Sequence, residues 1–258
     1  MDEVKVGYVQ WPEGLTHSGA EWDRIRRNVE ASRVDLLITN EMPFGSWLPE
    51  RSEFDSSAAH SWAEAHEQAI DALKALQVKA VVSSRPVIRG GKLVNEAFGL
   101  QDGQYRYLHH KKFFPQEAGF YEETWFDRGQ SGFETFELAG LEIGVLLCTE
   151  LFFNEHAREY GRGGVDLIVC PRASGTSMHR WKAAGALAAI VSGAYLISSN
   201  RYGPGELGQQ FGGMGFAYAP DGMLIGETSK EAPVCVANVS VALARQQKTE
   251  YPCYVRDL

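Results

Sequence analysis

The chain has 258 residues, a formal net charge of -8 and a pI near 5.4. This length allows one large domain or two small ones, and a hydrophobic content of 44% is ordinary for a globular protein. The acidic balance disfavours a broad basic surface, so we expect no nucleic-acid partner. The four cysteines show no CxxC or other metal-ligand spacing, so we expect no metal site and free thiols.

The N-terminal stretch, MDEVKVGYVQWPEG, lacks the basic segment followed by an apolar run that is typical of a secretory signal. The longest apolar runs, such as VDLLI and LEIGVLLC, are too short to span a bilayer. We therefore expect a cytoplasmic protein with no membrane partner.

The first part of the chain alternates short apolar runs with longer amphipathic segments, which is typical of a layered α/β protein. In the first amphipathic segment Trp22, Ile25 and Val29 fall on one helical face, and Ser18 precedes them as an expected N-cap. The elements expected here are a strand at 4–10, a helix at 18–33, a strand at 34–40 and a helix at 57–77.

Three strands are expected next, and the Gly90-Gly91 pair indicates a hairpin between the first two. Further on, a strand, a helix that Gly161 is expected to end, and a second strand form a βαβ unit. No repeat or low-complexity linker divides the chain, so we expect one domain over residues 1–258. The remaining elements are strands at 78–85, 92–100, 104–111, 141–147 and 165–171, a mostly apolar helix at 180–193, and later strands at 194–200, 213–220 and 233–239.

Glu41, Lys111 and Cys148 each stand at or just beyond the carboxyl end of a predicted strand. In open α/β sheets, ligands bind in the crevice outside these strand ends. Three such side chains facing one crevice would supply a carboxylate base, a cation and a nucleophile.

This combination of residue types has a chemical logic. A thiol with a pKa of about 8.5 is mostly protonated at neutral pH, whereas the thiolate is the nucleophile. A nearby lysine favours the thiolate and can stabilise an oxyanion, and a glutamate can take the proton. Each residue also fits a plain structural role: Cys148 as a packed thiol, Glu41 as a loop residue, and Lys111 as half of a solvated pair with Lys112. Spacing alone leaves both interpretations open.

Three segments resemble the nitrilase superfamily, the carbon–nitrogen hydrolases with a Glu-Lys-Cys catalytic set. VDLLITNEMPFG is similar to the strand that ends in the catalytic glutamate, HHKKFFPQEAGFYE to the lysine motif, and LEIGVLLCTELFFNEHAREYGRGGVDLIVCPRASG to the nucleophile elbow. The resemblance covers nearly the whole chain. It implies a four-layer αββα sandwich with Glu41 as the base, Lys111 as the oxyanion stabiliser and Cys148 as the nucleophile.

The lysine motif requires a choice between Lys111 and Lys112. Carbamoyl-amide hydrolases of this family have the lysine four residues before a proline, with GFYE or GFNE following, and counting back from Pro115 gives Lys111. The resemblance also implies that Glu122, in GFYE, orients Lys111 or the substrate by hydrogen bonding. It further implies that the backbone N–H of Thr149 helps to form an oxyanion hole.

Large aromatic residues near the strand ends are candidates for the substrate pocket, although such residues are at least as often core. These candidates are Phe44, Trp47, Tyr121, Phe152, Phe153 and Trp181.

The resemblance implies hydrolysis of a small amide or N-carbamoyl compound through a thioester, without a metal or an organic cofactor. Because Thr149 follows the cysteine, where true nitrilases usually have tryptophan, we favour amide over nitrile substrates. Nitrile hydrolysis, acyl transfer and a non-catalytic binding protein on the same fold stay open as alternatives. Relatives pair into homodimers and larger assemblies, so a homo-oligomer is expected.

Overall fold

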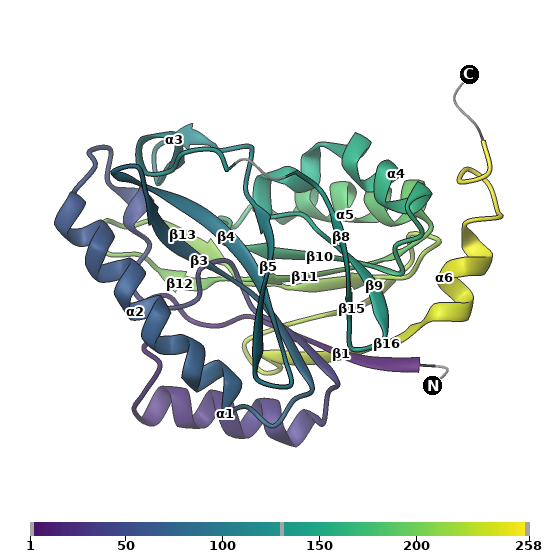
Figure 1. Cartoon of the computed structure of the whole chain (residues 1–258), viewed down its shortest axis with the longest axis horizontal. Coiled ribbons are helices and arrows are strands. Elements are labelled where there is room, and N and C mark those ends of the chain that lie inside the picture. The colour runs from purple at the N-terminus through teal and green to yellow at the C-terminus, as the bar shows by residue number, and fades with distance from the viewer. Residues whose placement is uncertain (1–2, 130–131, 256–258) are drawn as a thin grey trace.

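Two six-stranded sheets face one another at the centre of the computed structural model, which describes residues 3–129 and 132–255 (Figure 1). The first sheet has the order β16 (Val234–Ser240), β1 (Glu3–Val9), β2 (Leu36–Ile38), β3 (Ala80–Arg89), β4 (Lys92–Gln101) and β5 (Gln104–His110). The second has the order β15 (Leu224–Glu227), β14 (Phe216–Tyr218), β11 (Tyr195–Asn200), β10 (Leu167–Arg172), β9 (Leu141–Val145) and β8 (Thr135–Leu138).

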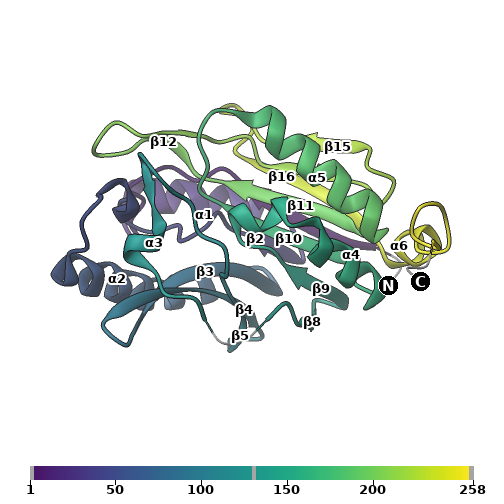
Figure 2. The same cartoon turned by 90° about the horizontal axis from the view of Figure 1, so that it is seen from above.

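Helices cover the outer faces of the sheets (Figure 2). The longer helices are α1 (Ala20–Ser32) and α2 (Ser56–Lys74) on the first sheet, and α4 (Asn154–Arg162) and α5 (Met178–Ser192) on the second. The shorter elements are α3 (Glu122–Trp125), α6 (Val241–Gln247), the 3-10 turns η1 (Leu48–Glu50) and η2 (Cys148–Phe152), and the small hairpins β6 (Gln116–Glu117) with β7 (Phe120–Tyr121) and β12 (Tyr202–Pro204) with β13 (Gln210–Gly212).

Separate hydrophobic clusters mark the interfaces between the layers. Ile38 of the first sheet and Val145 of the second belong to one cluster between the sheets. A second cluster joins α1 and α2 to the first sheet and includes Trp22, and a third joins α4 and α5 to the second sheet and includes Ala188. The order of layers is therefore helix, sheet, sheet, helix, and the predicted αββα sandwich is confirmed.

Local patterns predicted most of these elements. The Gly90-Gly91 hairpin is confirmed, because Arg89 pairs with Lys92 across the turn and both glycines have positive φ. The predicted βαβ unit is confirmed as well, since β9 and β10 are parallel neighbours joined by α4. The mostly apolar helix α5 is not buried on all sides, because Leu187 is 44% exposed.

Two predicted helix boundaries are wrong. Gly19, not Ser18, precedes α1, and its φ of 90° belongs to a region that residues with a Cβ rarely adopt. Gly161 does not end α4, which continues to Arg162 and is followed by Gly163. A Cβ on Gly161 would lie 2.4 Å from the carbonyl oxygen of Ser192, so this glycine permits close packing of α4 on α5.

The strand directions bring the predicted site residues to one end of the sandwich. Glu41 lies beyond β2, Lys111 directly follows β5, and Cys148 lies beyond β9. The backbone N–H of Glu41 donates to the carbonyl of Arg172 at the end of β10, at 3.2 Å, so the two sheets are joined here. The crevice that the sequence predicted therefore lies between two sheets rather than at the edge of one.

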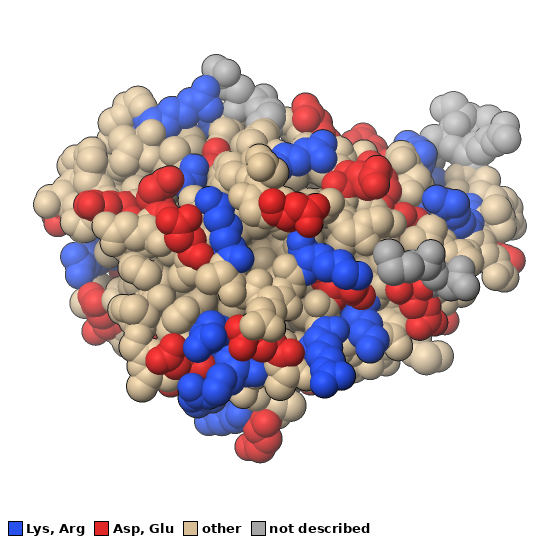
Figure 3. Space-filling view, turned by 60° about the horizontal axis from the view of Figure 1, so that its bottom comes forward, with Lys and Arg blue, Asp and Glu red and all other residues tan. Residues whose placement is uncertain are grey.

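Charged side chains of both signs are interspersed over the face shown in Figure 3. Some of these charges pair locally, as in α1, where Arg24 lies 2.6 Å from Glu21. None of the helices within the described ranges is long and apolar enough to cross a bilayer.

Candidate active site

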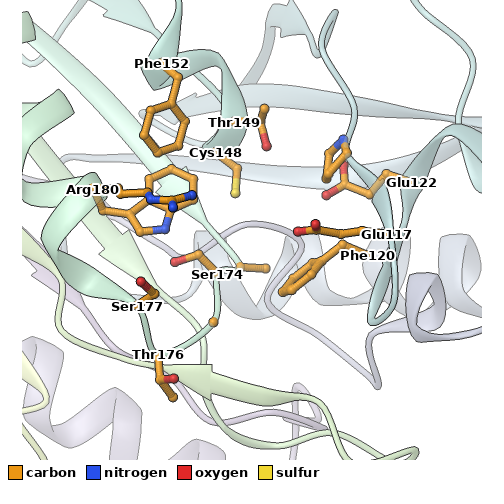
Figure 4. A pocket seen from close by; sticks show the side chains of 14 residues that line it. Glu117, Phe120, Glu122, Cys148, Thr149, Phe152, Ser174, Thr176, Ser177 and Arg180 are labelled. Atoms are coloured by element: carbon orange, nitrogen blue, oxygen red, sulfur yellow. The ribbon is translucent and has the colours of Figure 1, made fainter.

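Cys148 lies at a sharp turn between β9 and the 3-10 turn η2. Its φ is 49°, in the left-handed region that non-glycine residues seldom occupy. Such backbone strain persists only where the surroundings enforce it, and it is common at functional sites. The side chain is 3% exposed and lines the floor of a cavity (Figure 4). The structure thus presents the thiol at the end of a core strand, facing an open space.

Glu41 is completely buried, and each of its carboxylate oxygens accepts hydrogen bonds. Oε1 accepts from Lys111 Nζ at 2.8 Å and from Asn95 Nδ2 at 2.7 Å. Oε2 accepts from the backbone N–H of Ala173 at 3.1 Å. A carboxylate fixed by three donors from separate elements has little freedom to rotate, so its orientation in the site is set before any substrate arrives.

Lys111 is also completely buried and bridges two glutamates. Its Nζ lies 2.8 Å from Glu41 and 2.6 Å from Glu122. The neighbouring Lys112 points elsewhere, and its Nζ donates to the carbonyl of Gly129. The structure therefore brings Lys111 together with Glu41 and Glu122, as the spacing before Pro115 predicted, and leaves Lys112 out of the cluster.

The electrostatics of this cluster follow from burial and mutual charge. Burial alone would lower the pKa of Lys111, but the carboxylates of Glu122 and Glu41 hold it well above its usual range. Burial raises the pKa of Glu122 to about 8, even though Lys111 acts in the opposite direction. Burial and the charge of Glu41 raise the pKa of the Cys148 thiol. The Cys148 thiol is therefore neutral at rest, and it would need a base to remove its proton before it could act as a nucleophile.

The predicted oxyanion donor lies beside the thiol. Thr149 lines the cavity with Cys148 and is the second residue of η2. Backbone N–H groups in the first turn of a helix lack intrahelical acceptors, which leaves them able to bind an anionic oxygen. Lys111 also acts on this thiol, because its positive charge lowers the pKa of Cys148 against the effect of burial.

Glu150 joins the two segments that carry the lysine and the cysteine. Its carboxylate accepts from the backbone N–H of Lys112 at 2.6 Å and from that of Leu147 at 2.8 Å. His109 Nε2 lies 2.9 Å from the same carboxylate, and both side chains are buried. The residues next to Lys111 and Cys148 are thus tied to one carboxylate. The sequence carried no indication of the part played by His109.

The cavity in front of Cys148 has a volume of about 400 Å³ (Figure 4). Of the predicted aromatic residues, Phe152 and Trp181 line it, with ring centroids 4.6 Å apart. Phe44 and Trp47 are instead core residues, 2% exposed each, in different hydrophobic clusters. Tyr121 is half-buried in the short strand β7 and is not among the residues that line this cavity.

Two buried arginines that the sequence analysis did not consider support the site from behind. Arg172 donates to Ser198 and Ser174, and its guanidinium lies 5.0 Å from the ring centroid of Trp181. Arg201 donates to the carbonyl of Met42, in the segment that follows the catalytic glutamate candidate. An arginine in an apolar strand such as VDLIVCPR is a signal that was available in the sequence, because a buried guanidinium needs several acceptors.

No group of three or more His, Cys, Asp or Glu side chains in the described ranges could hold a metal ion.

The family model for carbon–nitrogen hydrolases matches residues 61–249, which is more than half of the chain. The chain belongs to the carbon–nitrogen hydrolase family. The matched range contains Lys111, Glu122 and Cys148, whereas Glu41 precedes it. The geometry described above places Glu41 in the same cluster.

Two curated relatives show what this carbon–nitrogen hydrolase is similar to. A glutamine-dependent NAD(+) synthetase of Xylella fastidiosa is 28% identical over 178 residues, 66% of this chain and 31% of that protein. An N-carbamoylputrescine amidase of Arabidopsis thaliana is 25% identical over 168 residues, 58% of this chain and 56% of that protein. The matches thus span about a third to a half of the length of these relatives.

Solved structures show the same fold. A carbon–nitrogen hydrolase from Helicobacter pylori superimposes with a TM-score of 0.87 at 20% identity, covering 97% of this chain and 94% of the other. A mutant amidase from Nesterenkonia sp. AN1 superimposes with a TM-score of 0.77 at 18% identity, covering 94% and 93%. That amidase is described with the acetamide moiety of fluoroacetamide covalently added to its active-site cysteine.

Proposed function

We propose that this carbon–nitrogen hydrolase cleaves a small amide or N-carbamoyl compound through a cysteine thioester. The observation that carries the proposal is the buried Lys111, held between Glu41 and Glu122 behind a thiol that opens on a cavity. The names of the two relatives, which refer to glutamine and to N-carbamoylputrescine, support an amide or carbamoyl substrate.

In the proposed reaction Glu41 removes the proton of Cys148 as the sulfur attacks the carbonyl carbon. The charge that develops on the carbonyl oxygen is stabilised by Lys111 and by the N–H of Thr149. When the tetrahedral intermediate collapses, the C–N bond breaks and the proton on Glu41 passes to the leaving nitrogen. Ammonia or an amine departs, and a thioester on Cys148 remains.

Water completes the cycle. Glu41, again ionised, takes a proton from a water molecule that attacks the thioester carbon. The second tetrahedral intermediate expels the sulfur, which regains the proton from Glu41, and a carboxylic or carbamic acid is released. The position of Glu41, fixed by Asn95 and Ala173, supports its use as the proton carrier in both halves.

The trapped intermediate tests this proposal. After rapid quenching from a simple amide such as butyramide, we expect mass spectrometry to find an acyl group on Cys148, with a burst of ammonia release. The variants Cys148→Ala and Cys148→Ser should lose the adduct and turnover. Cys235→Ala removes a thiol of a distant strand and should keep both. Normal turnover by Cys148→Ala would contradict the mechanism.

A further inference from the structure

The charges that line the cavity are arranged by depth. Cys148 and Glu122 lie at its floor, where they are 3% and 0% exposed. Glu117 and Arg180 line the same cavity but are exposed, so they stand at its mouth. A substrate whose carbonyl reaches Cys148 therefore presents its far end to one carboxylate and one guanidinium.

Two different elements hold these mouth residues on opposite sides of Cys148 (Figure 4). Glu117 belongs to the β6–β7 hairpin, where it pairs with Phe120, another residue of the cavity wall. Arg180 belongs to the first turn of α5, next to Trp181. A cation in the first turn of a helix is opposed by the helix dipole, so local helix stability does not account for Arg180.

Neither Arg180 nor Glu117 forms a salt bridge with another residue in the described part of the chain. The salt bridges that cross nearby segments involve other residues, and no described side chain pairs with Arg180 or Glu117. Glu122, the other carboxylate of the cavity, is already bound to Lys111. The two mouth charges are thus available to a ligand, and they are of opposite sign.

Three aromatic residues, Phe120, Phe152 and Trp181, line the cavity together with the hydroxyl residues Ser174, Thr176 and Ser177. The aromatic part of the wall is apolar, and a cavity of about 400 Å³ admits a short alkyl chain with a polar group at each end. Such a wall favours a methylene linker between the reacting amide and the charged end of the substrate.

On these grounds, and resting on the proposed function, we propose that the substrate is the side-chain amide of an α-amino acid. Its carboxylate binds Arg180, its ammonium binds Glu117, and its carbonyl lies at Cys148. The monoamide of a dicarboxylic acid would pair its carboxylate with Arg180 but would offer no cation to Glu117. An aminoalkyl amide would pair its ammonium with Glu117 but would offer no anion to Arg180.

Four amides of similar chain length separate these cases. They are L-glutamine, which carries both charges, glutaramate, which carries only the carboxylate, 4-aminobutyramide, which carries only the ammonium, and butyramide, which is neutral. We expect kcat/KM for ammonia release to be highest for L-glutamine. In Arg180→Met the ratio of L-glutamine to butyramide should fall by roughly tenfold, the scale of a partly exposed charge-assisted hydrogen bond.

Glu117 is tested by its own variant, and the Arg180→Met variant has a matched control. Glu117→Gln should lower the ratio of 4-aminobutyramide to butyramide and leave that of glutaramate unchanged or higher. Arg27→Met removes an exposed arginine of α1, remote from the cavity, and should change none of the ratios.

Failure of this inference differs from failure of the proposed function. If the wild type hydrolyses butyramide and L-glutamine equally well and Arg180→Met moves no ratio, the substrate class is wrong while the amidase function stands. If no amide is hydrolysed, the proposed function fails. Calorimetry on Cys148→Ala then decides the substrate class: binding of L-glutamine that Arg180→Met weakens supports it, and absence of binding overturns it.

Discussion

Lys111 is the residue on which the geometry of the site depends most. A lone ammonium in a water-free interior would be very unfavourable, and the two carboxylates at 2.8 and 2.6 Å offset this cost. The arrangement leaves one excess negative charge when both glutamates are ionised. Because burial raises the pKa of Glu122 to about 8, this glutamate holds its proton over part of the neutral range.

The adjacent lysines give a test with a built-in control. Lys111→Met removes the cation but keeps most of the side-chain volume, and we expect kcat/KM to fall by roughly 100- to 1,000-fold, the usual cost of losing one oxyanion donor. Lys112→Met removes a side chain whose Nζ donates to the carbonyl of Gly129 and which does not line the cavity, so kcat/KM should stay within about threefold. Circular dichroism checks that both variants fold. Equal losses in the two variants would contradict the assignment.

Sequence reasoning reached Lys111 but not the groups that hold it in place. The spacing from Pro115 is a one-dimensional signal, and it selects the lysine that the structure brings together with Glu41 and Glu122. Asn95 and His109 carry no such signal, because each acts through a partner more than 40 residues away, Glu41 and Glu150 respectively. The Asn95 contact depends on the order of strands within the first sheet, and the His109 contact depends on how β5 lies against the second sheet. Spacing along the chain reveals neither arrangement.

At the scale of elements, patterns of period and turn type predicted the order of helices and strands well. Helix ends were less predictable, as Ser18 and Gly161 show. Ser18 has the chemistry of an N-cap, yet the backbone before α1 requires a positive φ that Gly19 provides. Gly161 has the chemistry of a helix terminator, yet it lies inside α4 because α5 approaches closely there.

Gly161, inside α4, and Gly163, directly after it, separate a packing role from a terminating role. In Gly161→Ala the new Cβ would meet the Ser192 backbone at 2.4 Å, so we expect the free energy of unfolding to fall by about 1–3 kcal/mol. In Gly163→Ala the nearest atom is at 3.5 Å, and the free energy should be unchanged or slightly higher. Urea unfolding at pH 7 measures both. Similar values for the two variants would mean that α4 and α5 can separate without loss of stability.

At the scale of the whole molecule, the pocket was the least predictable feature. Phe44 and Trp47 follow a strand end, as pocket residues do, but they pack into the core. Aromatic side chains suit both places, and the choice depends on segments that arrive from elsewhere in the chain. Arg180 and Glu117 line the cavity because α5 and the β6–β7 hairpin meet in front of Cys148. Arg180 belongs to none of the three matching segments, and Glu117 lies inside the lysine segment but had no role assigned to it.

The contact between Phe44 and His66 makes the free energy of unfolding depend on pH. His66 in α2 is 3% exposed, and its Nε2 accepts a hydrogen bond from the backbone N–H of Phe44 at 3.2 Å. Its Nδ1 lies 3.0 Å from the carbonyl of Trp62, to which it donates. The imidazole is therefore neutral in the fold, and burial lowers the pKa of His66 to about 4.

The direction of the pH effect follows from this pKa. In the unfolded chain the imidazole has its usual pKa of about 6.5, so the unfolded state takes up a proton at a higher pH than the folded state does. The contribution of His66 to the free energy of unfolding is thus present above pH 6.5 and is lost as the pH falls towards 4. Between pH 7 and pH 5 the loss amounts to about 2 kcal/mol.

Urea unfolding of two histidine variants at pH 7 and pH 5 checks this expectation. His66→Gln removes the titrating group, so its free energy of unfolding should fall by about 2 kcal/mol less than that of the wild type over this range. His60→Gln changes an exposed histidine of the same helix and should follow the wild type. Parallel curves for all three proteins would show that His66 takes up its proton without unfolding, and that the link between α2 and the segment after Glu41 opens in acid.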